Sequence, residues 1–170
     1  MYDETAPTAL WDFALAVYGR PGVAPLCIAL QDHHGANVML IMHLCHCAAM
    51  GVNVVDVSEA AAAMAPLERH LVSPLRRARR VLAVAAEALP SEALTRAATR
   101  LLQAELSAER LQCRRVETPA PGKVPPDNLL SLAEQQLLAY FALLQPDGDW
   151  QHPAAASLAA AVFPTELHDR

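Results

Sequence analysis

Five consecutive residues of an apolar stretch, the segment HLCHC from His43 to Cys47, include two histidines and two cysteines. On a helix, His43, His46 and Cys47 are spaced by three and four residues, so their side chains project from one face. Imidazole nitrogens and thiolate sulfurs are ligands for zinc or a softer transition metal. A structural zinc site needs a fourth ligand, for which His33 and His34 are the candidates. The spacing therefore permits a metal site.

The same segment also has the composition of a buried core. The residues from Val38 to Met50 are apolar nearly all round, which predicts a helix at the centre of a bundle. Met39 shares a face with the histidines, and methionine, cysteine and neutral histidine are ordinary core residues. We therefore expect these side chains to pack in the core or to form a patch that faces a partner, and the metal site is the alternative.

A second polar group lies in the segment LQDHHGAN, where one helix is expected to turn into the next. Gln31 and Asp32 are placed to bind backbone groups at the start of the following helix and so to fix the turn. Alternatively, Gln31, Asp32 and His33 form a ligand or partner contact at a helix junction, where pockets in bundles commonly lie. No nucleophile, oxyanion motif or second carboxylate is spaced to join them, so we assign no catalytic residue and lean against an enzyme.

The segment RRARR places four arginines on one side of a helix, across about 160° of its surface. They are Arg76, Arg77, Arg79 and Arg80. We expect this basic face to pair with acidic residues of its own chain, such as Glu68 or Glu109. An acidic protein partner is the first alternative and nucleic acid the second, since four arginines could neutralise several phosphates.

Composition predicts an all-α protein. The 170 residues include 34 Ala and 25 Leu, with only 5% aromatic residues and no period-2 strand pattern of any length. Caps and apolar periodicity predict a single compact helical bundle of about six to seven helices without significant β-sheet. We expect one domain over 1–170, with a motif region at 8–51, a proline-rich linker at 117–127 and C-terminal helices within 128–163.

Charge and cysteine usage restrict partners and compartment. The net charge of −5 repels phosphate polyanions, so we expect no nucleic-acid partner. The four cysteines lack zinc-finger or redox spacing, and the N-terminal residues are acidic where a signal peptide would be basic. The longest apolar run covers about 15 residues, whereas a membrane-spanning helix needs about 20. These features predict a cytoplasmic protein with free thiols, without cofactor or membrane anchor.

The N-terminal third contains a distinctive spaced motif, W-x-F-x4-Y-x2-P-G-V-x3-C-x2-L-Q-D-x2-G-x-N-V, from Trp11 to Val38. With it the chain resembles a family of small, uncharacterised proteobacterial proteins that is classed as a domain of unknown function. The resemblance covers mainly the residues up to about Gly51. It implies a bacterial cytoplasmic protein, and it offers no catalytic residue, substrate or cofactor. Against this pattern His43, His46 and Cys47 are local departures.

The sequence favours a non-enzymatic protein–protein interaction module that uses a helix face. The candidate surface is made of the junction residues and the basic face, namely Gln31, Asp32, His33, Arg76, Arg77, Arg79 and Arg80. The partner is an unknown protein, and a homo-oligomer is left open. The alternative is a small-ligand or metal-binding helical protein, conceivably an enzyme, that uses His43, His46 and Cys47.

Overall fold

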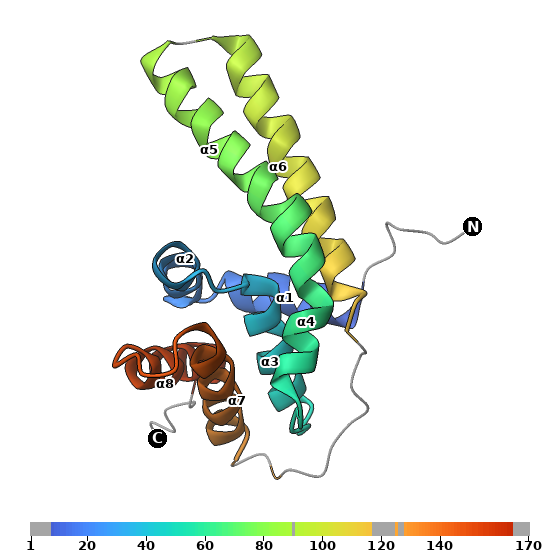
Figure 1. The fold of residues 1–170 in the computed structure, drawn as a ribbon, viewed down its shortest axis with the longest axis vertical. Helices are drawn as coiled ribbons and strands as arrows, with labels where there is room; N and C mark the ends of the chain where they lie inside the picture. Colours follow the sequence, from blue (N-terminus) through green and yellow to red (C-terminus); the bar gives the residue numbers. More distant parts are fainter. Residues whose placement is uncertain (1–7, 90, 117–124, 126–127, 165–170) are drawn as a thin grey trace, which may run out of the picture. The chain divides into compact units, whose positions relative to one another are not determined.

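The computed structural model describes residues 8–89, 91–116, 125 and 128–164, and the regular secondary structure of these residues is all helical (Figure 1). Among these residues there is no β-strand, which confirms the all-α prediction. The helices are α1 (Ala9–Tyr18), α2 (Val23–His34), α3 (Val38–Ala49), α4 (Val57–Leu67), α5 (Ser73–Ala88), α6 (Glu92–Cys113), α7 (Leu129–Leu144) and α8 (Gln151–Val162), with a π-helical segment η1 (Glu68–Val72) between α4 and α5.

The described residues fall into two compact units. The hairpin unit consists of residues 62–116, and the core unit combines those within 8–61 with those within 125–164. The hairpin unit is therefore inserted in sequence between the two parts of the core unit. The expectation of one domain stays a prediction, and the predicted proline-rich linker at 117–127 lies outside the described residues apart from Pro125.

The first three helices begin and end where local sequence signals place them. The side chain of Thr8 caps α1 by accepting the backbone N–H of Trp11, at 3.1 Å. Gly35 ends α2 with a φ of 68°, a left-handed conformation that glycine adopts without steric cost. The side chain of Asn37 then caps α3 by accepting the N–H of Leu40. The sequence predicts an N-cap at Thr8, a C-terminal cap at Gly35 and an N-cap at Asn37, and the structure confirms all three.

Helix α3 forms the centre of the core unit. Every side chain from Met39 to Ala48 is buried, and α1, α2 and α7 pack against this helix. Such complete burial removes most of its apolar surface from water. Each Å² of apolar surface that is buried stabilises the fold by about 25 cal/mol. The prediction that this segment lies inside a bundle is confirmed.

The later helices close the core unit through long-range hydrogen bonds. The hydroxyl of Tyr140 on α7 accepts the backbone N–H of Asn37, at 2.7 Å, in a buried position. The Arg20 side chain, in the turn between α1 and α2, donates to the carbonyl of Val162 at the end of α8. Cationic side chains near a helix C-terminus satisfy carbonyls that have no partner within the helix.

The path through η1 differs from the prediction. The sequence predicts that Pro66 interrupts or restarts the helix after Ala65 and that Ser73 caps a new helix. In the structure α4 continues through Pro66 and runs through η1 into α5. Ser73 has helical backbone angles, and its hydroxyl donates to Glu68 at 2.7 Å instead of capping. The wider π-helical turn lies directly before Pro74, whose ring is incompatible with a regular α-helical turn behind it.

No helix among the described residues is by itself both long and apolar enough to cross a bilayer, although α1 and α2 together, bent by 104°, reach that length and composition.

Replacing Tyr140 by Phe removes the hydroxyl that accepts the N–H of Asn37 and leaves this buried donor without its partner. We expect Tyr140→Phe to lower the free energy of unfolding by about 1–3 kcal/mol in urea titrations. Ser131→Ala, which removes an exposed hydroxyl from the same helix, is the control and should change it by less than about 0.5 kcal/mol. Equal effects of the two variants would show that the Tyr140 hydroxyl does not stabilise the α2–α3 turn.

Candidate binding surface

A cluster of buried ion pairs joins α5 and α6 in the hairpin unit. The guanidinium of Arg76 contacts three carboxylates, from Nε to Glu105 at 2.8 Å, from Nη2 to Glu109 at 3.0 Å and from Nη1 to Glu68 at 3.3 Å. Arg79 contacts the other oxygen of Glu105 at 2.7 Å. The expected pairing of the basic face with Glu68 and Glu109 is thus confirmed for Arg76.

Burial determines the electrostatics of this cluster. The side chain of Arg76 is 11% exposed and that of Glu105 only 4%. Burial opposes the charge on Arg76, but the surrounding carboxylates, Glu68 first, raise its pKa above the ordinary value. For Glu109, burial raises the pKa although Arg76 acts in the opposite direction. Removing one partner of such a set leaves buried charge uncompensated, so we interpret Arg76 as a structural residue.

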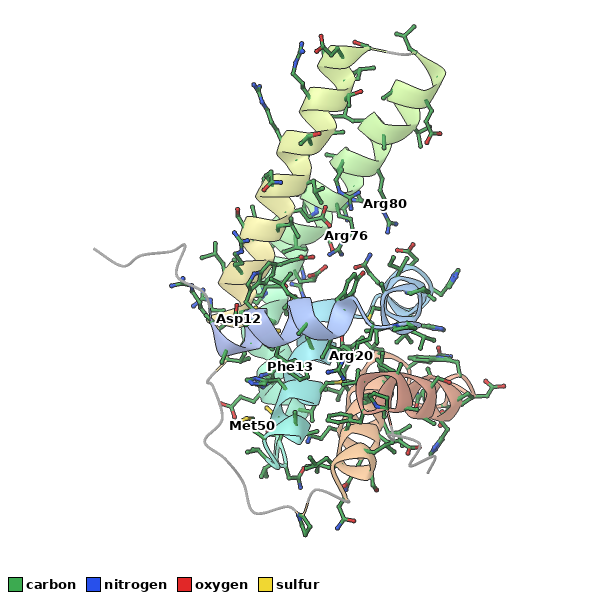
Figure 2. All side chains as sticks on the ribbon, turned by 180° about the vertical axis from the view of Figure 1, so that it is seen from behind. Asp12, Phe13, Arg20, Met50, Arg76 and Arg80 are labelled. Atoms are coloured by element: carbon green, nitrogen blue, oxygen red, sulfur yellow. The ribbon has the colours of Figure 1, made fainter. Side chains whose placement is uncertain are left out.

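The other two arginines of the predicted basic face, Arg77 and Arg80, are exposed on α5. Figure 2 labels Arg76 and Arg80 on this helix. Two large apolar side chains follow them, Val81 at 68% and Val84 at 65% exposure. By 100° steps, Arg77, Arg80, Val81 and Val84 fall within about 100° of the helix surface. We call these four residues the α5 face.

Charge is strongly segregated along the sequence. Residues 62–116 include ten arginines and five glutamates, a net charge of +5, whereas the rest of the chain has three basic and thirteen acidic residues, a net charge of −10. Three of the five glutamates, Glu68, Glu105 and Glu109, are engaged with Arg76. The surface of the hairpin unit is consequently more basic than its net charge indicates.

The histidine and cysteine cluster is packed inside the core unit. His43 and His46 are each 6% exposed, and Cys47 is 2% exposed. The Cys47 sulfur lies 3.6 Å from Nε2 of His43, and the ring of His46 packs against that of Phe13 with centroids 5.0 Å apart. Among the described residues, no group of three or more His, Cys, Asp and Glu side chains is arranged to hold a metal ion.

The protonation states of this cluster follow from its burial. Burial, with a smaller contribution from neighbouring His46, lowers the pKa of His43 to about 4. Burial also raises the pKa of the Cys47 thiol to about 11. At neutral pH the pair is therefore a neutral imidazole and a neutral thiol, which is a weak nucleophile.

The predicted junction at Gln31, Asp32 and His33 lies at the end of α2. Asp32 and His33 are exposed, and the Gln31 amide donates to Asp32 at 3.3 Å. The next residue, His34, stacks on Trp150 from the start of α8, with ring centroids 3.7 Å apart and planes inclined by 14°. The structure thus brings this junction against a segment that the sequence analysis did not connect with it, and its role as a binding surface stays a prediction.

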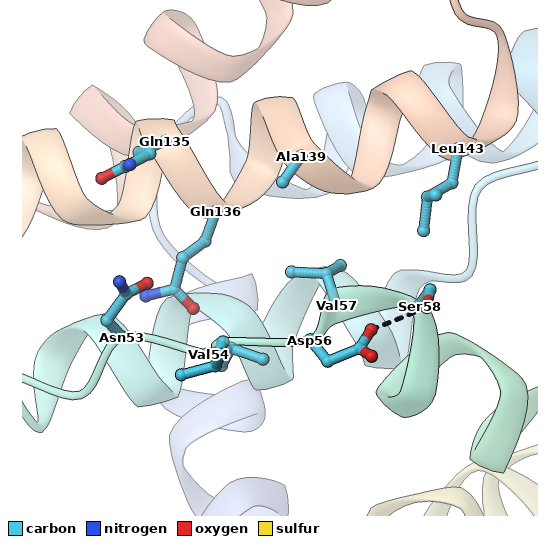
Figure 3. Close-up of a pocket in the computed structure, with 10 residues that line it drawn as sticks. Asn53, Val54, Asp56, Val57, Ser58, Gln135, Gln136, Ala139 and Leu143 are labelled. Carbon is cyan, nitrogen blue, oxygen red and sulfur yellow. Dashed lines mark hydrogen bonds between the residues drawn. The ribbon is translucent and has the colours of Figure 1, made fainter.

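Sequence reasoning missed a groove in the core unit. A pocket of about 440 Å³ lies between residues 53–58 and α7 (Figure 3). Gln136 enters it from α7 and binds the carbonyl of Val52 across 84 residues of sequence. The only signal in the sequence is the pair Gln135-Gln136 within a mostly apolar helix, because a buried glutamine there needs a distant polar partner.

Comparison with known proteins gives a family but no function. The model of a family described as a protein of unknown function, DUF2390, matches residues 9–116. No curated protein matches the chain, and no solved structure matches it either. The family match confirms the resemblance to a domain of unknown function, and it extends well past Gly51, through α6.

Arg76→Ala removes the cation that faces three carboxylates, so we expect it to lower the free energy of unfolding by about 3–5 kcal/mol. Arg77→Ala removes an exposed arginine from the next position and should change it by no more than about 0.5 kcal/mol. Urea titrations followed by circular dichroism measure both values. A loss below about 1 kcal/mol for Arg76→Ala would contradict a structural role for the cluster.

The lowered pKa of His43 predicts a pH dependence of stability. Above pH 6.5 His43 is neutral in both states, whereas between pH 6.5 and 4 the unfolded chain binds a proton that the folded chain excludes. Stability is therefore lost as the pH falls through this range, by up to about 3 kcal/mol. We expect His43→Leu to flatten this part of the stability profile, measured by urea titrations between pH 4 and 6.5.

Proposed function

Since the chain belongs to the DUF2390 family, whose function is unknown, we propose from its own surfaces that it is a non-enzymatic protein–protein interaction module. The α5 face is its binding surface, and the partner is an acidic amphipathic helix of another protein. The observation that carries this proposal is the combination, on one side of α5, of exposed arginines with the exposed side chains of Val81 and Val84.

The burial of the glutamates gives this surface its charge. Arg76 and Arg79 engage the carboxylates of Glu105 and Glu109 between α5 and α6, so these carboxylates are held by the more buried arginines of the helix. Exposed charges of one sign steer an oppositely charged partner and set its orientation more than they add affinity. The two valines supply the apolar contact that a stable complex requires.

The chemistry of the α5 face favours an acidic helix over nucleic acid. A phosphate backbone offers nothing apolar to cover Val81 and Val84, and residues 62–116 include no Phe, Trp or Tyr on which a base could stack. An amphipathic helix with leucines on one stripe and glutamates beside it complements both parts of the face. The net charge of −5 on the whole chain also disfavours nucleic acid.

The first experiment separates the contribution of the arginine charges from that of the apolar contact. We expect a pull-down to recover a protein whose binding to the purified chain is then reproduced with both components pure. The double variant Arg77→Glu/Arg80→Glu and the uncharged variant Val81→Ser/Val84→Ser should each weaken this binding by about tenfold or more. Arg69→Glu/Arg100→Glu changes the charge equally at exposed positions outside the α5 face, and it should retain the affinity within about twofold.

The same variants also show whether the α5 face binds something other than an acidic helix. If the chain binds duplex DNA with a steep salt dependence, and both charge variants lose this binding, the partner is nucleic acid and not an acidic helix. Binding to vesicles of anionic lipid, or concentration-dependent self-association in sedimentation, would replace it by a membrane surface or by a second copy of the chain. Equal binding by the α5-face variants and the wild type would rule out this surface.

A further inference from the structure

The groove between residues 53–58 and α7 combines hydrogen-bond acceptors with an aliphatic wall (Figure 3). Gln136 lies beside Asn53 and Val54, and Asp56 lies further along the groove toward Leu143. The pocket volume of about 440 Å³ is within the range of small-molecule sites. No lysine, arginine or histidine lines it. The chemistry of its polar groups therefore determines what it can hold.

Gln136 contributes an acceptor that the protein leaves unused. The residue is 2% exposed, and its Nε2 donates to the carbonyl of Val52 at 3.0 Å. This bond fixes the orientation of the amide, because the flipped amide would place its oxygen against the Val52 carbonyl oxygen. The Oε1 atom of Gln136 is buried and accepts no hydrogen bond from the described residues. An acceptor in that state lowers stability until a donor binds it.

Asp56 contributes the second acceptor. Its Oδ1 accepts the Ser58 hydroxyl at 2.6 Å and the backbone N–H of Glu59 at 3.0 Å, so both bonds fall on one oxygen. The Oδ2 atom takes part in neither of these two bonds. The hydrogen bonds from Ser58 and then Glu59 lower the pKa of Asp56, which keeps the carboxylate ionised at neutral pH.

Aliphatic side chains form much of the remaining lining, beside the polar Asn53 and Gln135. Val54 and Val57 lie on one wall, and Ala139 and Leu143 follow Gln136 along α7 at helical spacing. Leu143 is 51% exposed, so part of this wall is open to water. An anion would be repelled by Asp56, and a purely apolar ligand would leave both acceptors unused.

We propose that this groove binds an aliphatic ammonium compound with two N–H donor groups, one at Asp56 and one at Gln136, whose hydrocarbon chain covers Ala139 and Leu143. Two sources supply this chemistry. One is a free diamine or polyamine, and the other is a lysine side chain of a protein, which has an ammonium group and a backbone N–H joined by an aliphatic chain. The site is separate from the α5 face and does not depend on it.

The test uses 1,5-diaminopentane as the probe, with binding followed by two-dimensional NMR of the ¹⁵N-labelled full chain. We expect saturable shifts of the Gln136 side-chain amide and of the backbone amides of residues 53–58. The neutral analogue 1,5-pentanediol and the anion glutarate should bind at least about tenfold more weakly, because each lacks the charge that Asp56 recognises. N-acetyl-lysine methylamide is the second probe, and the tighter of the two amines identifies the source.

Variants locate the site. Asp56→Asn keeps a residue that caps α4 well, so we expect an intact fold and an affinity reduced by about tenfold or more. Gln136→Leu should also weaken binding. If that variant does not fold, Asp56→Asn decides alone. Asp149→Asn removes an exposed carboxylate of the same unit outside the groove and should leave the affinity within about twofold.

Three results would overturn the proposal. The first is the absence of saturable shifts up to about 10 mM diamine. The second is equal weakening by Asp149→Asn and Asp56→Asn, which would indicate attraction to the acidic chain as a whole. The third is equal binding of the pentanediol, which would assign the shifts to apolar contact alone.

Discussion

The complete burial of α3 is the constraint from which the core unit follows. A helix whose side chains from Met39 to Ala48 are all buried needs neighbours on every side, and α1 and α2 cannot surround it alone. The remaining side is covered by α7, which comes about 80 residues later in the chain. The bond from the Asn37 N–H to Tyr140 fixes this return at the start of α3. The imidazoles and thiols of α3 are consequently held neutral inside the unit.

The hairpin unit is stabilised in a different way. Ion pairs as well as apolar contacts hold α5 against α6, since Arg76 and Arg79 contact the carboxylates of Glu105 and Glu109. Buried ion pairs of this kind add little net stability compared with apolar packing, but they specify which residues face each other. Here they also determine which charges reach the surface. The hairpin unit exposes basic residues, while the acidic residues of the chain lie mainly elsewhere in the sequence.

The helix boundaries were predictable wherever the signal lies within one turn of the chain. Thr8, Gly35 and Asn37 act on residues three to five positions away, so the sequence correctly indicates the start of α1, the end of α2 and the start of α3. Ser73 has the same local signature, yet its side chain does not cap α5, because its hydroxyl binds Glu68 and η1 runs directly into α5. A cap motif competes there with a tertiary contact, and the contact prevails.

The sequence by itself determined the all-α fold, the burial of α3 and the presence of a basic helix face, because periodicity and capping act between near neighbours. Tertiary structure decided which arginines of that face form buried ion pairs, since Arg76 contacts Glu105, which lies 29 residues away in the sequence. It also created the groove at Gln136, whose opposite wall comes from residues about 80 positions earlier. Contacts at such separations depend on how the helices pack, and no local pattern records that packing.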